Sequence, residues 1–146
     1  MSVKVFVDTN VLVYAHDIDA GGKQQTAENI LFRLRQQRSG AVSMQVLQEF
    51  YTTATRKLAR SLSKEEARAI VEDFAYWCVA TTPAEISHAF RIEDEARINF
   101  WDAMIVAAAI KAGATRILSE DLSHGQIYDG VKVVNPFHGL AAKITS

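Results

Sequence analysis

Four acidic residues each stand at the start or end of an expected helix or strand: Asp8, Glu49, Asp102 and Asp121. Carboxylates only a few ångströms apart repel one another unless they are protonated or bridged by a cation. Mg²⁺ or Mn²⁺ is the natural bridge for an all-oxygen site, whereas zinc prefers sites that contain His or Cys. A carboxylate-bound divalent ion supplies hydroxide and neutralises a phosphate, which is what phosphodiester hydrolysis needs. Taken singly, each acid is better explained as a helix cap or a solvated charge, but four acids together are harder to explain in this way.

The expected elements bring these acids to one edge of a sheet. Val3 to Val7 is an apolar run of β-formers, typical of a parallel strand buried on both faces, and it delivers Asp8 to the carboxyl edge where ligands bind. The other acids also adjoin expected elements: Asp121 follows a strand at 115–118, Asp102 lies in the first turn of a helix at 100–112, and Glu49 lies near the start of a helix at 45–60.

Strands alternate with helices along the chain, which predicts an α/β protein with a mainly parallel sheet and right-handed crossovers. Besides the strand at 3–7, we expect strands at 41–43, 76–80, 115–118 and 131–134. Helices are expected at 11–15, 23–37, 45–60, 64–75, 83–97 and 100–112. Capping boxes that begin at Ser63 and Thr82 mark two of the helix starts, Ser43 is placed to cap another, and Asp129-Gly130 predicts a turn.

Composition limits the classes of function. A chain of 146 residues with 49% apolar and 23% charged residues fits one globular domain. With a net charge of −1, the chain is not basic enough to be a general nucleic-acid binder. The longest apolar run, Ala103 to Ile110, is too short to span a bilayer, and no signal peptide is visible, so we expect a cytoplasmic protein. The single Cys78 excludes an internal disulfide and is expected to be a buried, inert thiol.

Several segments together resemble a PIN domain of the VapC toxin type, over essentially the whole chain. They are Val3 to Asn10, Ser43 to Phe50, Phe100 to Ile105, Ile117 to Asp121 and Val134 to Phe137. The resemblance implies a Mg²⁺-dependent endoribonuclease, with Mn²⁺ as a substitute. By position, its catalytic and metal-binding acids match Asp8, Glu49, Asp102 and Asp121, and its neighbouring polar positions match Asn10, Ser43 and Ser119. Glu120, adjacent to the fourth acid, is the alternative for that role.

We therefore expect one PIN-like domain over residues 1–146, with three α/β/α layers around a central, mainly parallel five-stranded sheet. The resemblance also implies its partners: an RNA substrate, a cognate antitoxin protein and a second copy of the chain in a homodimer. The helices between Gln24 and Ala75 are a candidate surface for the dimer. The RNA target, the cleavage sequence and the choice between one and two metal ions stay open.

Two clusters of cations are candidate RNA contacts, although cations at helix C-termini also compensate the helix dipole. They comprise Arg33, Arg35 and Arg38 in one cluster and Arg56, Lys57, Arg60 and Lys64 in the other. Trp101 is a candidate for stacking on a base, but core packing is the expected role. His16 and His124 are expected to be packed or solvated.

Other classes of protein remain as alternatives. A stand-alone RNA-processing nuclease would share the same acids. A non-catalytic PIN module that only binds proteins is a further alternative, but its acids should be eroded, whereas all four are present here. A phosphatase of the HAD-like type requires a second acid two residues after the first, where this chain has Asn10. A receiver domain requires paired acids and a later lysine, a pattern that we do not find.

Overall fold

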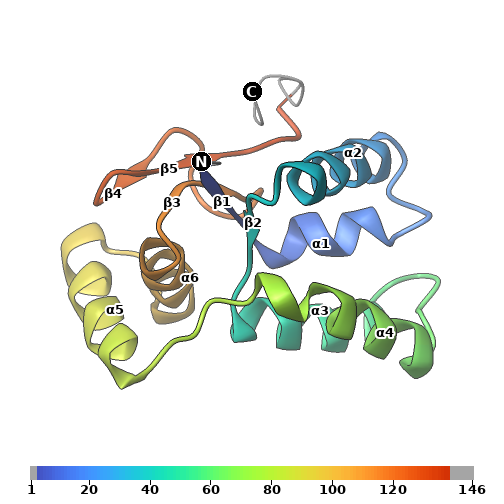
Figure 1. Cartoon of the computed structure of the whole chain (residues 1–146), viewed down its shortest axis with the longest axis horizontal. Coiled ribbons are helices and arrows are strands. Elements are labelled where there is room, and N and C mark those ends of the chain that lie inside the picture. The colour runs from blue at the N-terminus through green and yellow to red at the C-terminus, as the bar shows by residue number, and fades with distance from the viewer. Residues whose placement is uncertain (1–2, 139–146) are drawn as a thin grey trace.

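The computed structural model describes residues 3–138, so the ends of the expected domain lie outside the described residues. Five strands form one sheet in the order β2-β1-β3-β5-β4 (Figure 1). They are β1 (Lys4–Val7), β2 (Gly40–Ala41), β3 (Ala114–Leu118), β4 (Ile127–Tyr128) and β5 (Val131–Val134). The first three pairings are parallel, and only β4 runs antiparallel to its neighbour β5. The structure therefore confirms the mainly parallel five-stranded sheet.

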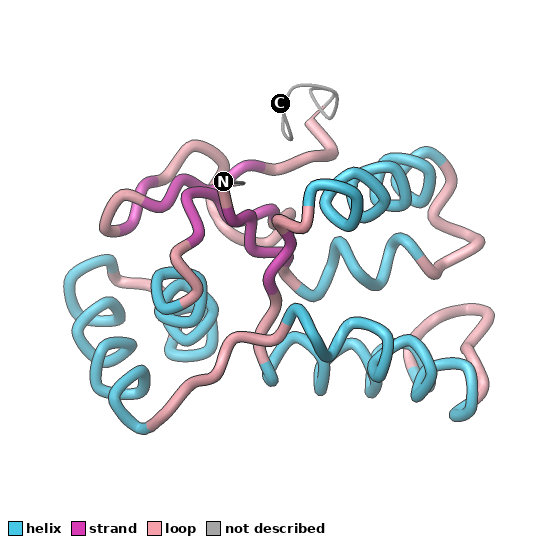
Figure 2. The backbone as a smooth tube through the Cα atoms, viewed as in Figure 1, coloured by secondary structure: helices cyan, strands magenta, loops and turns pink. Residues whose placement is uncertain are grey.

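In the described part of the chain six α-helices flank the sheet: α1 (Thr9–Ala15), α2 (Gly22–Gln37), α3 (Met44–Arg56), α4 (Lys64–Phe74), α5 (Pro83–Ala96) and α6 (Phe100–Lys111). Figures 1 and 2 show α5 and α6 as one group beside the strands and α1 to α4 as another, which gives the three-layer α/β/α arrangement. Within residues 3–138, every helix is too short or too polar to cross a membrane.

The core follows from the most apolar segments. Val5, Phe6 and Val7 of β1 are buried, as expected for a strand covered on both faces. The small side chains of α6 are buried from Ala103 to Ala109 apart from Met104, so this helix packs closely on β3. Both capping boxes, at Ser63 and at Thr82, form as predicted, and Asp129-Gly130 makes the turn between β4 and β5 with positive φ at both residues.

The strand expected at 76–80 is wrong. Ala75–Trp77 forms a 3₁₀ turn, and Cys78 makes only an isolated bridge to Val42. The reason is packing, because the Trp77 ring lies directly over Gly40, where any larger side chain would collide with it. The fifth strand is instead β4, whose two residues are too few to give a recognisable pattern.

Two smaller expectations also change. The helix expected to run to Arg60 ends at Arg56, because the chain turns back so that the Leu62 amide donates to the Ala54 carbonyl at 2.9 Å. Cys78 is only partly buried, and this burial raises the pKa of its thiol. The raised pKa disfavours the reactive thiolate, in agreement with an inert cysteine.

Candidate active site

Two of the four acids lie side by side at the carboxyl edge of the sheet. The ends of β1 and β3 are paired, Val7 with Leu118, and the Asp8 amide continues the pairing by donating to the Leu118 carbonyl at 3.0 Å. Asp8 follows β1 directly, and Asp121 comes in the loop after β3. Parallel pairing therefore brings together two acids that are far apart in the sequence.

Asp8 is nearly fully buried, with 6% of its surface exposed. One carboxylate oxygen accepts from the Thr9 amide at 2.8 Å, and the other accepts from the Ser119 hydroxyl at 2.7 Å. Burial, with smaller contributions from the charges of Asp121 and Glu49, raises the pKa of Asp8 from its ordinary value of 3.8 to about 6 against these hydrogen bonds. Its burial and the neighbouring acids make the Asp8 carboxylate unfavourable as an anion. A cation bound to this carboxylate would offset that cost.

Asn10 and Ser119 connect Asp8 to the loop after β3. The Asn10 side-chain amide lies 3.4 Å from the Asp8 carboxylate and 3.3 Å from the Asp121 carboxylate. The Asn10 side-chain oxygen accepts from the Glu120 backbone amide at 3.0 Å, and the Ser119 hydroxyl accepts from the Asp121 backbone amide at 3.1 Å. The predicted supporting positions Asn10 and Ser119 therefore hold the two acids next to each other.

Glu49 reaches the same edge from the second turn of α3. The Thr9 hydroxyl donates to one of its carboxylate oxygens at 2.7 Å, and the Gln45 side-chain amide lies 3.4 Å from the other. The Gln45 amide also donates to the Trp101 carbonyl at 3.2 Å, which links α3 to α6. Sequence reasoning missed Thr9 and Gln45, although the spacing of four residues between Gln45 and Glu49 marks a pair on one helix face.

Asp102 lies in the first turn of α6, where Asn99 caps the helix. The Asp102 amide donates to the Asn99 side-chain oxygen, and the Asn99 side-chain amide donates to the Asp102 carboxylate, each at 2.9 Å. Burial raises the pKa of Asp102, and the charges of Asp121 and Glu49 add to the rise. Asn99 was also missed, although an Asn three residues before the predicted first-turn acid is a capping signal.

The donor set suits a hard divalent cation by its chemistry. It offers four carboxylates, and a bound cation would offset the burial and the smaller repulsion that together raise the pKa values of Asp8 and Asp102. Within residues 3–138, no three His, Cys, Asp or Glu side chains stand close enough together to form a ready-made metal shell. The four acids therefore form a group linked by electrostatic interactions, but among the described residues they do not form a closed coordination sphere.

Glu120 points to different partners from those of Asp121. Its carboxylate pairs with Lys23 at 2.6 Å and accepts a hydrogen bond from the Tyr14 hydroxyl. Although its burial opposes the change, the hydrogen bonds from Lys23 and Tyr14 lower the pKa of Glu120. Glu120 is thus compensated by a cation of the protein itself, whereas Asp121 faces Asn10 and the other acids.

Ser43 and Arg38 contact groups other than the four acids. Ser43 is buried and caps α3, where its hydroxyl accepts from the Val46 amide at 3.3 Å. Arg38 follows α2, and its carbonyl contacts Lys4 at the amino end of β1, the opposite edge from Asp8. Its neighbour Arg33 belongs to the same end of α2.

The second cluster of cations lies at the far end of α3. An α-helix rises about 1.5 Å per residue, so Arg56 lies roughly 10 Å along the axis beyond Glu49. Lys57 follows it, and Arg60 pairs with Asp19 at 3.4 Å in the loop between α1 and α2. Contacts of RNA with either cluster stay a prediction.

The expected core packing of Trp101 is wrong, because its side chain is 63% exposed. The helix α6 turns its small residues toward the sheet, and this leaves Trp101 on the outer face beside Asp102. Its ring meets Phe100 edge-on at 5.1 Å between centroids, and Phe100 lies 5.7 Å from Phe90. An exposed aromatic strip therefore adjoins the acids.

His16 is packed and His124 is exposed, which agrees with the expectation that each is packed or solvated. The His16 ring packs on Phe50 at 5.5 Å between centroids, with its Nδ1 2.9 Å from the Leu12 carbonyl. The His124 ring accepts from the Asn135 amide at 2.9 Å.

Solved structures of three bacterial proteins share this fold. A DNA-bound VapBC2 structure from Rickettsia felis matches with 18% identity and a TM-score of 0.63, covering 90% of this chain and 97% of that one. A DNA-bound VapBC structure from Salmonella typhimurium matches with 23% identity and a TM-score of 0.60, covering 90% and 96%. The sarcin–ricin-loop-cleaving toxin VapC20 from Mycobacterium tuberculosis matches with 20% identity and a TM-score of 0.57, covering 81% and 92%.

At these identities the three structures establish the fold alone. A search of curated proteins found no match to the chain. The family model described as PIN domain matches residues 5–130, a stretch that contains Asp8, Glu49, Asp102 and Asp121. Because this match spans most of the chain, the protein belongs to the PIN-domain family of nucleases.

Proposed function

We propose that the protein is a Mg²⁺-dependent endoribonuclease, with Mn²⁺ as a substitute, and the toxin of a toxin–antitoxin pair. The observation that carries the proposal is the buried Asp8 carboxylate, whose pKa is raised by burial and by two neighbouring acids. A buried carboxylate costs free energy as an anion, and a cation beside it offsets this cost; a hard divalent ion is the one that its oxygen neighbours would hold.

Asp8 and Asp102 would hold the metal directly, and Glu49 and Asp121 would hold it directly or through its waters. When bound, the ion supplies a hydroxide at neutral pH and neutralises the phosphate that is attacked. Glu49 or Asp121 would orient the attacking water and accept its proton. Asp121 rather than Glu120 is the fourth acid, because Lys23 already neutralises Glu120.

The polar neighbours keep these acids ready for the reaction. The Ser119 hydroxyl and the Thr9 amide fix both oxygens of Asp8, and the Thr9 hydroxyl fixes Glu49. The exposed Trp101 would stack on a base of the RNA, since aromatic rings bind single strands in this way. The substrate is accordingly single-stranded or looped RNA.

The similar VapBC structures support a protein antitoxin as the partner. Its segment would enter the acidic edge and offer an Arg to the carboxylates. An apolar groove of about 530 Å³ between α3 and α4, lined by Met44, Leu47, Tyr51 and Val71 among others, supports a protein partner on this surface. The same surface is the candidate for a homodimer.

The test is cleavage of looped RNA by the purified protein. We expect cleavage with Mg²⁺ or Mn²⁺, and its loss in EDTA. The variant Asp102→Asn should lose cleavage, whereas the matched control Asp94→Asn, an exposed change on α5, should keep it. Undiminished cleavage in EDTA would rule out the metal mechanism.

Thermal melts test the metal site separately from cleavage. Binding of Mn²⁺ to the folded state alone stabilises it by about 2.7 kcal/mol at a hundredfold excess over Kd, a rise of several degrees in Tm. Asp102→Asn should lose most of that rise, and Asp94→Asn should keep it. Equal rises in both variants would remove Asp102 from the metal site.

A further inference from the structure

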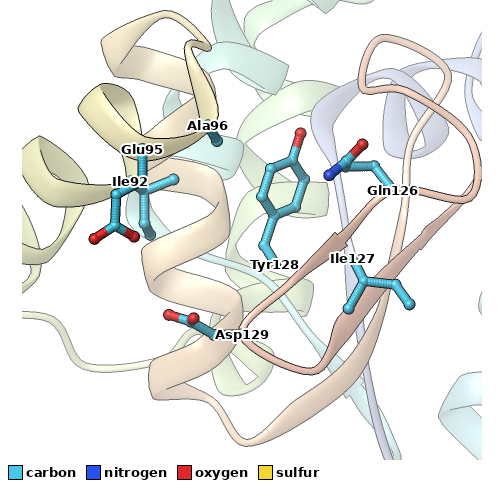
Figure 3. Close-up of a pocket in the computed structure, with 7 residues that line it drawn as sticks. All are labelled: Ile92, Glu95, Ala96, Gln126, Ile127, Tyr128 and Asp129. Carbon is cyan, nitrogen blue, oxygen red and sulfur yellow. The ribbon is translucent and has the colours of Figure 1, made fainter.

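A second concave site lies between α5 and β4, outside the cluster of acids. It is a pocket of about 230 Å³, lined by Ile92, Glu95, Ala96, Gln126, Ile127, Tyr128 and Asp129 (Figure 3). Pockets for drug-sized ligands measure about 300–1,000 Å³, so this one suits a smaller group such as a single planar ring system.

Two polar side chains of the pocket have no partner among residues 3–138. They are the Gln126 side-chain amide and the Tyr128 hydroxyl. Figure 3 shows the Tyr128 hydroxyl between Ala96 and the Gln126 amide, so both polar groups lie at the same end of the pocket. Although Tyr128 as a residue is only 8% exposed, its hydroxyl is not among the buried polar atoms that lack a partner, and Gln126 is exposed. Both groups are therefore open to solvent and available to hydrogen-bond a ligand along one edge of the pocket.

The polar end of the pocket lies toward the acids. Because β4 is antiparallel to β5, Gln126 stands near the carboxyl edge of the sheet, where its carbonyl accepts from the Val133 amide at 2.8 Å. On the other wall, α5 ends at Ala96, three residues before the Asn99 that caps the helix of Asp102. Burial, and then the charge of Asp102, raises the pKa of Tyr128 and keeps its hydroxyl protonated as a donor.

The charges of the pocket disfavour a phosphate and favour a neutral group. Its ionisable lining residues are Glu95 and Asp129 besides Tyr128, and the neighbouring basic side chains already contact these two acids. Arg91 lies 3.7 Å from the Asp129 carboxylate and 4.0 Å from that of Glu95, and His88 lies 3.3 Å from Asp129. The walls are the apolar Ile92 and Ala96 and the flat Tyr128 ring. A neutral planar ring with polar edges, such as a nucleobase, fits this lining.

We propose that the pocket between α5 and β4 binds one unpaired RNA base near the bond that is cut, with Gln126 and Tyr128 hydrogen-bonded to the edge of the base. The Gln126 amide offers a donor and an acceptor side by side, the pairing that glutamine makes with base edges in nucleic acids. The inference rests on the proposed ribonuclease function, and it adds a subsite that selects the base beside the cleavage position.

The first test measures binding without cleavage. Adenosine, guanosine, cytidine and uridine are titrated separately into the isotope-labelled full chain, with ribose 5-phosphate as a probe that lacks a base. We expect at least one nucleoside to shift the NMR signals of the Gln126 side chain and the Tyr128 backbone, and ribose 5-phosphate to leave them unchanged. Gln126→Ala and Tyr128→Phe should each weaken the binding of that nucleoside about tenfold, which is the effect of losing one hydrogen bond.

Matched variants separate binding from folding. Gln126 is exposed, so Gln126→Ala keeps the fold even if Tyr128→Phe disturbs it. Tyr76→Phe, which removes a hydroxyl from an exposed ring outside the pocket, should bind nucleosides like the parent. If all four nucleosides leave the Gln126 and Tyr128 signals unshifted, the pocket is not a base site.

The second test uses cleavage of a mixed-sequence RNA pool. Gln126→Ala should change the base preference at one position beside the cut while the metal-induced rise in Tm stays that of the parent. If the parent and Gln126→Ala cleave with the same base preference beside the cut, the proposed subsite is refuted, but the proposed nuclease function stands. Nucleoside binding in the pocket without any RNA cleavage would instead refute the nuclease function and keep the base pocket.

Discussion

The buried Asp8 makes the metal-free protein sensitive to pH in a predictable direction. Its pKa is about 6 in the folded protein against an ordinary value of 3.8, so the folded state holds the proton more tightly than the unfolded state. Folding free energy gained from this proton is fully present below about pH 4 and is lost as the pH rises through about 6. At about 1.4 kcal/mol for each pH unit, the loss amounts to roughly 3 kcal/mol.

Urea denaturation in EDTA at several pH values between 4 and 7.5 measures this loss, with Asp8→Asn as the comparison. The amide does not titrate, so the variant should lack the part of the pH dependence that belongs to Asp8. The comparison uses the change with pH and not the absolute stability, because the amide also faces the donors Thr9 and Ser119 and will cost some free energy.

Divalent cations should reverse the effect. A cation bound to the Asp8 carboxylate competes with the proton, so Mn²⁺ should stabilise the parent much more at pH 7.5 than at pH 4.5. Parallel pH curves for the parent and Asp8→Asn in EDTA would refute the reasoning, because they would show that burial leaves the titration of Asp8 unaltered.

Two further predictions concern the neighbours of the site. Asp121→Asn should abolish cleavage and most of the Mn²⁺-induced rise in Tm. Glu120→Gln should keep both, and the loss of its ion pair to Lys23 should lower the stability by no more than about 1 kcal/mol. Thermal melts and cleavage rates measure both effects. Trp101→Ala should weaken the binding of single-stranded RNA about tenfold or more, as measured by fluorescence anisotropy. Because the Trp101 ring is exposed, the Tm of this variant should stay within a few degrees of that of the parent. A large fall in Tm with unchanged RNA binding would contradict the stacking role.

The sequence by itself determined the features that depend on neighbouring residues. The Val3–Val7 run specifies a buried strand, and the capping boxes at Ser63 and Thr82 specify two helix starts, because each signal is completed within a few residues. The same local signals put Asp8 after a strand and Asp102 in a first helical turn. The order of the elements then predicts that these acids share an edge.

Only the tertiary structure shows how adjacent residues differ in their partners. The sequence matches Asp121 to the fourth acid and keeps Glu120 as the alternative. In the structure Lys23, 97 positions from Glu120, pairs with Glu120, whereas Asn10 faces Asp121. The partners that complete the site, Asn10 with Ser119 and Thr9 with Glu49, are 109 and 40 positions apart.

Packing likewise overrode two local patterns. The β-rich segment that contains Trp77 became a turn because its ring lies over Gly40, and the apolar Trp101 stayed outside because the opposite face of α6 fills the core. A run of β-formers indicates a preference for a strand, and an aromatic side chain indicates a preference for burial. Which surface it meets depends on segments far away in the chain, and that contact determines its burial, its partners and its charge.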